Sequence, residues 1–386
     1  MINGQKKDLG LYIHIPFCVR KCDYCDFLSA PADEETKNKY VKALIAEIKS
    51  YKTVSAEYLV KTIFIGGGTP SSLEGKLIKA IMDTIREVFR ISCGDIEEQP
   101  EITIEVNPGT ITSEKLLCYK NAGINRLSFG LQSADNNELK MLGRIHTYET
   151  FKENYNLARE LGFRNINIDL MSGLPGQTLE NWLYTLQETV KLDPEHISAY
   201  SLIIEEGTPF YLRYREEDQD EELDRKIYAK TKEYLEKTGY YRYEISNYAK
   251  PGFESRHNSS YWLRTDYLGL GLGASSLLNK IRFQNEDNLS VYLKNSAEYH
   301  NIRRNEEPLT RNQQMEEFMF LGLRMSKGIS KNNFKKIFGE TIESIYGEII
   351  NKSLLEGLIE AKGDKIYLTD KGIDLSNIVL SRFLLD

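Results

Sequence analysis

Three cysteines lie close together near the start of the chain, in the segment HIPFCVRKCDYCDF. They are Cys18, Cys22 and Cys25, spaced as Cys-x3-Cys-x2-Cys, and they follow the apolar run 11–15. Three thiolates can hold an iron–sulfur cube and leave one of its irons without a protein ligand. An iron left open in this way can bind the amino and carboxylate groups of a small chelating ligand. The spacing therefore predicts a [4Fe–4S] cluster with one open iron.

Two other roles for the cysteine triplet have to be weighed. Free cysteines often pack as small hydrophobic residues, which fits poorly with a charged setting. The charged neighbours are Arg20, Lys21, Asp23 and Asp26. A structural zinc site needs four ligands, and no fourth cysteine or histidine stands at the usual spacing, although His14 is nearby. Both alternatives explain the triplet less well than an iron–sulfur cluster does.

A glycine-rich segment, Gly66-Gly67-Gly68-Thr69-Pro70, follows the second apolar run. Glycine has no Cβ, so the polar groups of a ligand can approach the backbone closely at such positions. The simpler interpretation is an ordinary turn between a strand and a helix. Taken together with the cysteine triplet, the segment is a candidate binding element for the ligand of the open iron.

Short apolar runs alternate with helical patterns over the first two thirds of the chain. In the first helical pattern Val41, Leu44, Ile45 and Ile48 recur on one face. Repeated strand–helix units form parallel sheets or open barrels, whose functional side chains lie at the carboxyl ends of the strands. The cysteine triplet and the glycine segment both stand at such ends. The runs expected as strands are 11–15, 62–66, 102–106, 126–130, 165–170 and 196–202.

The pattern changes after about residue 213. The acidic run REEDQDEELDRK indicates a solvated helix start, and the segment 300–310 looks like a linker. Beyond it, helical patterns precede a short hairpin that turns at Gly363-Asp364. This order predicts a winged-helix-like module, a class that often binds DNA. Residues 300–386 hold 13 basic and 13 acidic side chains. Because a DNA-binding face normally has a basic excess, we expect no nucleic-acid partner.

The composition indicates a globular protein of the cytoplasm. The chain of 386 residues has a formal net charge of −7 and five cysteines. This charge gives no general attraction to nucleic acid or anionic lipid, and the odd number of cysteines argues against a disulfide framework. No apolar stretch reaches the length of a membrane span, and the first residues lack the apolar core of a secretory signal. We therefore expect a cytoplasmic protein without a transmembrane segment.

The Cys-x3-Cys-x2-Cys spacing resembles the signature of the radical-SAM superfamily. The resemblance implies that S-adenosylmethionine (SAM) binds the cluster, and that the reduced cluster donates an electron to its sulfonium. Cleavage of SAM then gives methionine and a 5′-deoxyadenosyl radical, which takes hydrogen from a substrate. The fold expected on this basis is α/β, a partial (β/α)6 radical-SAM barrel with a smaller helical, winged-helix-like C-terminal domain.

Further segments resemble one branch of this superfamily, the oxygen-independent coproporphyrinogen III dehydrogenases and their relatives. The segments are GGGTP, IEVNP, SFGLQS, LGRIHT and NIDLMSGLPGQT, and the similarity runs over nearly the whole chain. It implies that carboxylates bind the ribose hydroxyls or the ammonium of SAM, and that Arg144 binds its carboxylate through two donors. The implied SAM-binding residues are Tyr12, Tyr24, Gly67, Gly68, Thr69, Glu105, Gln132, Arg144, Asp169 and, through its backbone, Ile203.

Two departures separate the chain from the true dehydrogenases of this branch. In those enzymes a fourth cysteine stands where this chain has Phe27, and a longer N-terminal extension helps to shape the substrate site. The pattern CDYCDF, the segment RHNSSYW and the short N-terminus instead resemble the HemW group. That resemblance implies a haem chaperone that carries haem to apo-haemoproteins, including respiratory enzymes. The alternative is the dehydrogenase reaction, the radical oxidative decarboxylation of propionate side chains, so enzymatic activity stays open.

A contact with haem has one candidate side chain. Haem needs an apolar slot and an axial ligand such as histidine. His257 stands in RHNSSYW beside Tyr261 and Trp262, whose rings could cover a porphyrin face. The other interpretation of this pattern is a hydrogen-bonded histidine packed by aromatic rings.

The sequence also predicts how the chain is divided. We expect a radical-SAM barrel over residues 1–240, a barrel extension and connector over 241–300, and a HemN-like C-terminal domain over 301–386.

Overall fold

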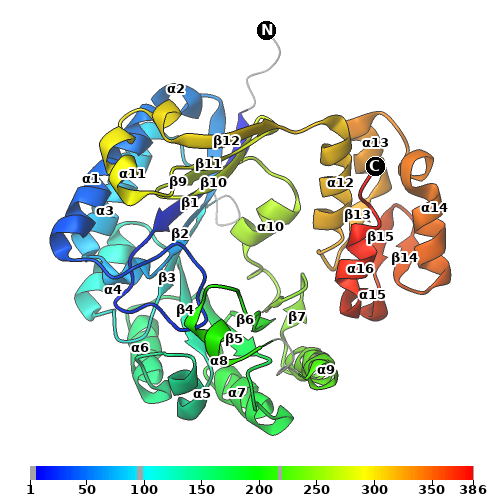
Figure 1. Cartoon of the computed structure of the whole chain (residues 1–386), viewed down its shortest axis with the longest axis horizontal. Coiled ribbons are helices and arrows are strands. Elements are labelled where there is room, and N and C mark those ends of the chain that lie inside the picture. The colour runs from blue at the N-terminus through cyan, green and yellow to red at the C-terminus, as the bar shows by residue number, and fades with distance from the viewer. Residues whose placement is uncertain (1–5, 94–98, 216–219, 386) are drawn as a thin grey trace.

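The computed structural model describes residues 6–93, 99–215 and 220–385. Six parallel strands, each followed by helical structure, form its centre (Figure 1). These strands are β1 (Lys7–Ile15), β2 (Tyr58–Gly67), β3 (Glu101–Val106), β4 (Arg126–Gln132), β5 (Ile166–Ser172) and β6 (His196–Ser201). The connecting elements are α1 (Glu34–Ser50), α2 (Lys52–Ser55), η1 (Pro70–Ser72), α3 (Gly75–Val88), α4 (Ser113–Asn121), α5 (Asn136–Met141), α6 (Tyr148–Glu160) and α7 (Leu179–Lys191). Each of the six predicted runs overlaps one of these strands.

Shorter elements from the middle of the chain extend both edges of this parallel sheet. They are α8 (Pro209–Arg213), α9 (Glu221–Lys237), β7 (Tyr241–Arg242), β8 (Asn247–Ala249), α10 (Arg256–Trp262), β9 (Tyr267–Leu270), β10 (Ser275–Leu278), β11 (Ile281–Asn285), α11 (Leu289–Asn295), η3 (Tyr299–Asn301) and β12 (Arg303–Pro308). The strand order is β12-β11-β10-β9-β1-β2-β3-β4-β5-β6-β8-β7. Figure 1 shows this sheet curved into an open barrel with α1, α3, α4, α6 and α7 outside it.

The prediction of a linker around residues 300–310 is wrong. Residues Arg303–Pro308 form β12, which pairs antiparallel with β11 at the edge of the large sheet. The segment RRNEEP has no apolar alternation because it is an edge strand whose side chains are mostly exposed. Charged side chains on an edge strand also discourage pairing with another chain. The acidic run after residue 213 includes residues 216–219, which lie outside the described residues, and α9 begins just beyond them at Glu221.

A second, smaller core forms the C-terminal part of the chain. Its elements are α12 (Arg311–Gly322), β13 (Ile329–Ser330), α13 (Lys331–Phe338), α14 (Ile342–Leu355), β14 (Ile359–Lys362), β15 (Lys365–Leu368), α15 (Asp370–Asp374) and α16 (Ser376–Ser381). Strands β14 and β15 pair antiparallel around Gly363-Asp364, so the predicted hairpin is confirmed. The barrel core runs from Leu9 to Ile302 and the second core from Met315 to Phe383. The domain boundaries at 240 and 300 stay a prediction.

Buried charges hold the C-terminal part against the barrel. Glu317 of α12 is only 5% exposed and accepts hydrogen bonds from Arg264 and Arg282, at 3.1 and 2.6 Å. Arg324, just beyond α12, lies over the ring of Trp262 at the end of α10, 4.3 Å from its centroid. Both contacts reach the segment between α10 and β11. In the part of the chain that the structure describes, no helix is long and apolar enough to cross a membrane.

Candidate functional site

The cysteine triplet lies in the loop between β1 and α1, here called the cysteine loop (residues 16–30). Phe17 and Ala30 form a parallel bridge at its base, and the Cys18 amide donates to the Ala30 carbonyl at 3.2 Å. Cys18 is buried, whereas Cys22 and Cys25 are half-buried. The Cys25 amide donates to the Cys22 carbonyl at 3.2 Å, so a tight turn brings these two cysteines together.

Contacts from the barrel fix the far side of the cysteine loop. The Asp23 amide donates to the Leu142 carbonyl beyond α5, at 3.2 Å. The Asp23 carbonyl accepts from the Phe210 amide of α8 at 2.9 Å, and its carboxylate pairs with Arg213. The ring of His14 lies 2.9 Å from the Leu28 carbonyl through its Nε2. The loop is therefore held by β1, α5 and α8 together.

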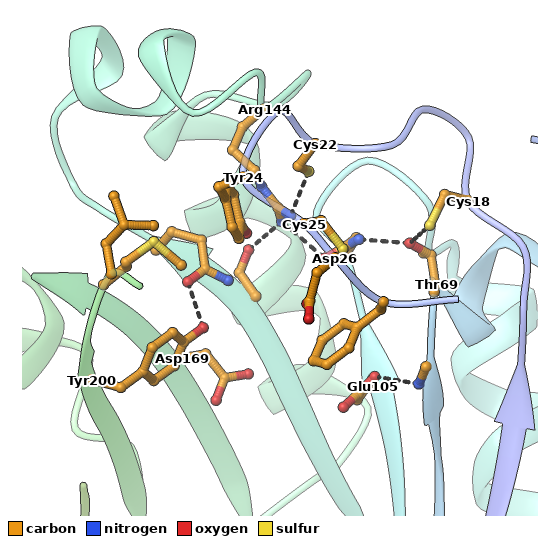
Figure 2. A pocket seen from close by; sticks show the side chains of 18 of the residues that line it. Cys18, Cys22, Tyr24, Cys25, Asp26, Thr69, Glu105, Arg144, Asp169 and Tyr200 are labelled. Atoms are coloured by element: carbon orange, nitrogen blue, oxygen red, sulfur yellow. Dashed lines mark hydrogen bonds between the residues drawn. The ribbon is translucent and has the colours of Figure 1, made fainter. Parts of the chain in front are cut away.

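A cavity of about 330 Å³ opens beside the loop, at the carboxyl ends of the parallel strands (Figure 2). All three cysteines line it, and so does every predicted SAM-binding residue except Tyr12. The predicted residues that the structure brings together here are Tyr24, Gly67, Gly68, Thr69, Glu105, Gln132, Arg144, Asp169 and Ile203. Parallel strands end at one edge of a sheet, which is why motifs far apart in the sequence meet here.

The carboxyl groups of Glu105 and Asp169 line this cavity. Glu105 accepts a hydrogen bond from the Gly67 amide at 3.0 Å. Its burial, with the charge of Asp169 nearby, raises its pKa from 4.5 to about 8. Burial also raises the pKa of Asp169, although Ser128 and Asn167 donate to it at 3.1 and 2.8 Å. A cationic ligand in the cavity would favour the ionised form of both groups.

Arg144 supplies the opposite charge at the same rim. Its Nη1 donates to the Cys22 sulfur at 3.4 Å, and its Nη2 donates to the Gly130 carbonyl at 2.5 Å and to Asn107 Oδ1 at 2.8 Å. Its Nε is buried without a hydrogen-bond partner. The guanidinium is therefore held in one orientation, with one N–H directed at a thiol of the triplet and another N–H unpaired.

The GGGTP segment needs glycine because the cysteine loop and β1 pack directly against its backbone. Gly67 has φ +114°, and a Cβ there would lie 2.6 Å from the ring of His14. A Cβ at Gly68 would lie 2.8 Å from the Phe17 carbonyl oxygen and 3.0 Å from the Cys18 sulfur. The absence of side chains thus lets the end of β2 touch the loop that carries the cysteines.

Tyr12 and His257 lie away from the cavity. Tyr12 does not line the cavity, and its hydroxyl lies 3.0 Å from Nδ1 of His14, two residues further along β1. His257 is 1% exposed, with Nδ1 2.8 Å from the Thr62 hydroxyl and Nε2 2.8 Å from the Tyr261 hydroxyl. Burial lowers its pKa to about 3. Both imidazole nitrogens therefore have protein partners in this structure, as the alternative interpretation of a hydrogen-bonded histidine packed by aromatic rings predicts.

Several residues of the site were missed in the sequence. The Tyr200 hydroxyl donates to Gln132 Oε1 at 2.9 Å on the cavity wall, and Asn107, Ser128 and Met171 also line the cavity. Asn107 stands two positions after Glu105 in IEVNP, and Ser128 two positions before Gly130 in β4. Residues two apart on a strand point to the same face, so strand alternation could have found Ser128.

The donor set suits iron–sulfur chemistry. Soft thiolates are the ligands of such clusters, and two of the three thiols here receive hydrogen bonds, Cys18 from Thr69 at 3.5 Å and Cys22 from Arg144. Among the residues that the structure describes, no three His, Cys, Asp or Glu side chains are grouped around a single metal-ion position, whereas each thiol of the triplet would bind a different iron of a four-iron cluster.

Family models match both parts of the chain. The model of the radical SAM superfamily matches residues 12–189. The model of the HemN C-terminal domain matches residues 309–375, which hold the second core.

The chain is also similar to characterised proteins over nearly its whole length. It is 38% identical to the heme chaperone HemW of Bacillus subtilis (strain 168) over 380 residues, which cover 97% of this chain and 98% of that protein. It is 43% identical to HemW of Escherichia coli (strain K12) over 267 residues, 69% of each chain. Among solved structures, coproporphyrinogen III oxidase (HemN) of Escherichia coli, a radical SAM enzyme, superimposes with a TM-score of 0.86 at 26% identity. That match covers 98% of this chain and 90% of HemN.

Proposed function

Because the chain belongs to the HemW family of radical SAM proteins, we propose that it is a haem chaperone that holds a [4Fe–4S] cluster, SAM and haem. The observation that carries this proposal is the meeting of three thiols with a cavity that also presents the carboxyl groups of Glu105 and Asp169 and the guanidinium of Arg144. The curated relatives that share this length are heme chaperones by name. Haem is the cargo in this proposal, and apo-haemoproteins, respiratory enzymes among them, are the recipients.

The cysteine loop would hold the cluster through Cys18, Cys22 and Cys25. Once bound, such a cluster supplies an electron to the sulfonium of SAM. The chain's own contribution is to fix the thiols through the β1–α1 loop and to direct donors from Thr69 and Arg144 at two of them. Hydrogen bonds to ligating sulfurs stabilise negative charge on the cluster.

The cavity would take SAM beside the cysteine loop. Glu105 and Asp169 are the acceptors available for an ammonium or for ribose hydroxyls, and both have raised pKa values that a bound cation would lower. The guanidinium of Arg144, which lines the same cavity, is the candidate donor for a carboxylate. Tyr24 and Ile203 also line the cavity, and the backbone of Ile203 would be the contact for the adenine ring.

A second candidate function is the dehydrogenase reaction on coproporphyrinogen III. The likeness of the whole fold to HemN, a coproporphyrinogen III oxidase by name, favours it. Phe27, at the position of the dehydrogenases' fourth cysteine, argues against it: its side chain is 61% exposed and lines the cavity. We therefore rank the chaperone first.

Haem binding and enzymatic turnover can be separated in one preparation. The protein is reconstituted with iron and sulfide without oxygen and then titrated with haem while the Soret band is followed. The same preparation is incubated with SAM, a reductant and coproporphyrinogen III, and the porphyrin products are measured by fluorescence after oxidation. Stoichiometric haem uptake, transfer of that haem to an apo-haemoprotein and absence of protoporphyrinogen are the expected results. Catalytic turnover would reverse the ranking, and no haem uptake would refute the chaperone.

Two variants sharpen this experiment. Phe27→Cys restores the dehydrogenases' fourth cysteine, and turnover by this variant alone would show that Phe27 blocks the reaction. His257→Ala tests haem ligation directly. Because both imidazole nitrogens are already hydrogen-bonded, we expect it to lower stability and to leave haem stoichiometry unchanged. Loss of the Soret band at unchanged stability would return His257 to the haem site.

A further inference from the structure

Two of the three cysteines are joined by a continuous chain of side-chain hydrogen bonds. Thr69 Oγ1 lies 3.5 Å from the Cys18 sulfur, and Asn107 Nδ2 lies 2.8 Å from Thr69 Oγ1. On the other side, Asn107 Oδ1 lies 2.8 Å from Arg144 Nη2, and Arg144 Nη1 lies 3.4 Å from the Cys22 sulfur. Asn107 is therefore the central link between two thiols that come from the same loop (Figure 2 shows the two ends).

The direction of every hydrogen bond in this chain follows from one residue. A guanidinium can only donate, so the Asn107 oxygen must face Arg144 and its NH2 must face Thr69. The Thr69 hydroxyl accepts this N–H, which leaves its own proton for Cys18. Arg144 in turn donates to Cys22. Each end of the chain thus presents a donor to a sulfur, and the amide of Asn107 fixes that polarity.

The backbone around Asn107 holds its side chain in place. Asn107 follows the last residue of β3, and its amide donates to Ser71 Oγ of η1 at 3.1 Å. Its carbonyl accepts from the Thr110 hydroxyl at 2.6 Å. Thr69 is fixed as well, because its amide donates to the Phe17 carbonyl at the base of the cysteine loop, at 2.7 Å. The link is therefore part of the structure of the barrel mouth.

We propose that Asn107 is a positioning residue that orients the Thr69 hydroxyl and the Arg144 guanidinium toward the thiolates of Cys18 and Cys22. Through these two donors it sets the reduction potential of the bound cluster. This inference rests on the proposed function, because it requires the three cysteines to hold a [4Fe–4S] cluster. Donors to ligating sulfur stabilise the more negative, reduced cluster and so raise its potential.

One isosteric substitution reverses the direction of the hydrogen bond between Asn107 and Thr69. In Asn107→Asp the second side-chain oxygen replaces the NH2 group that faces Thr69, so the Thr69 hydroxyl must donate to the carboxylate and turns away from Cys18. The oxygen that faces Arg144 is kept. Thr69→Val removes the same donor at its source, and Thr69→Ser keeps a hydroxyl as the matched control.

The experiment measures the reduction potential of the cluster and does not depend on catalytic turnover. Wild type and each variant are reconstituted without oxygen, their iron and sulfide contents are determined, and the cluster is titrated with a reductant while its EPR signal is followed. For Asn107→Asp we expect the ratio of reduced to oxidised cluster at the wild-type midpoint to fall about tenfold, which is a shift of about 59 mV for a one-electron couple. Thr69→Val should shift the potential in the same direction, and Thr69→Ser should leave it unchanged.

The double variant tests the route of the effect. In the Thr69→Val background no hydroxyl is left to turn, so Asn107→Asp can act only through its charge. The shift in potential of the double variant should therefore be smaller than the sum of the shifts of the two single variants. Unmoved potentials in loaded Asn107→Asp and Thr69→Val protein, or fully additive shifts, would overturn the role of Asn107.

Failure of the proposed function would look different. Wild-type protein that takes up no cluster would overturn that function and this inference together, whereas loaded protein with unmoved potentials overturns the inference alone. If Asn107→Asp keeps its thermal stability but takes up no cluster, Asn107 is needed to hold the thiols in place, which also supports the positioning role.

Discussion

Two buried glutamates show how differently the chain uses the same side chain. Glu47 lies on α1, on the flank of the barrel, and is 0% exposed. Its carboxyl group accepts from the Gly271 amide at 2.9 Å, from Asn285 Nδ2 at 2.7 Å and from the Tyr292 hydroxyl. It joins α1 to the β9–β10 turn, to β11 and to α11, and it does not line the cavity beside the cysteine loop.

Glu105, at the mouth of the barrel, is in the opposite situation. Among the described residues only the Gly67 amide donates to it, and its carboxyl group borders the cavity beside the cysteine loop. Burial raises the pKa of both glutamates, of Glu47 to about 7 and of Glu105 to about 8. A raised pKa alone therefore does not identify a functional carboxyl group. The number of hydrogen-bond donors that the protein supplies to the carboxyl group is the better guide. A group with unused acceptor sites next to a cavity is available to a ligand.

The largest expected effect comes from the cysteine loop. Cys22→Ala should remove the cluster altogether, with loss of its broad visible absorbance and of bound iron, because two thiolates cannot replace three. Thermal stability of the cluster-free protein should stay near wild type, since Cys22 is half-buried. The matched control is Cys118→Ala on α4, away from the loop, which should keep its iron. Unchanged iron content in Cys22→Ala would show that the triplet does not hold the metal.

Removing the Glu47 carboxyl group should lower stability and leave the ligand site intact. In Glu47→Ala three buried donors lose their acceptor and a cavity remains, so we expect a loss of about 4 kcal/mol in the free energy of unfolding. Urea unfolding of cluster-free protein measures it. Cluster content and SAM affinity of the folded variant should equal those of wild type. A drop in SAM affinity without loss of stability would remove the distinction between the two glutamates.

The flank glutamate should also make stability depend on pH. Below pH 4.5, the ordinary pKa, Glu47 is protonated in both states. Between 4.5 and about 7 the unfolded chain has released this proton while the folded chain keeps it, so the free energy of unfolding falls as pH rises. The fall amounts to about 3 kcal/mol and levels off above pH 7.

Glu47→Gln isolates this contribution. The variant cannot ionise, so the difference between its stability and that of wild type should change over pH 4.5 to 7 and then stay constant. Urea unfolding of cluster-free protein at a series of pH values gives both curves. Parallel curves for the two proteins over this range would show that Glu47 does not titrate as its burial demands.

Much of the barrel mouth could be predicted because local sequence encodes it. The cysteine spacing, the glycines of GGGTP and the polar residues at strand ends all lie within short segments, and parallel strands bring such ends together whatever their separation in sequence. The carboxyl ends of six strands and the winged-helix-like hairpin were predicted on these grounds. The exact role of each predicted SAM residue stays a prediction.

Long-range pairing explains what the sequence could not reveal. His257 was singled out by its aromatic neighbours, but its ring is fixed by Thr62 on β2, 195 residues earlier in the chain. The importance of Glu47 depends on Tyr292, 245 residues later. No pattern near either residue shows these partners. Strand β12 was missed for a related reason, since an exposed edge strand need not alternate apolar and polar residues.

The smallest expected effect belongs to Glu105→Gln, which exchanges a single atom of the cavity wall. Glu105→Gln keeps an oxygen for the Gly67 amide and removes the negative charge that a cationic ligand would stabilise. We expect SAM affinity to fall about tenfold, or about 1.4 kcal/mol, when reconstituted protein is examined by equilibrium dialysis. Stability should stay level or rise, since burying a neutral amide costs less than burying a carboxylate with a single hydrogen-bond donor. If the variant instead unfolded more easily and bound SAM normally, Glu105 would be a structural carboxyl group like Glu47, and unused acceptor sites beside a cavity would no longer mark the ligand site.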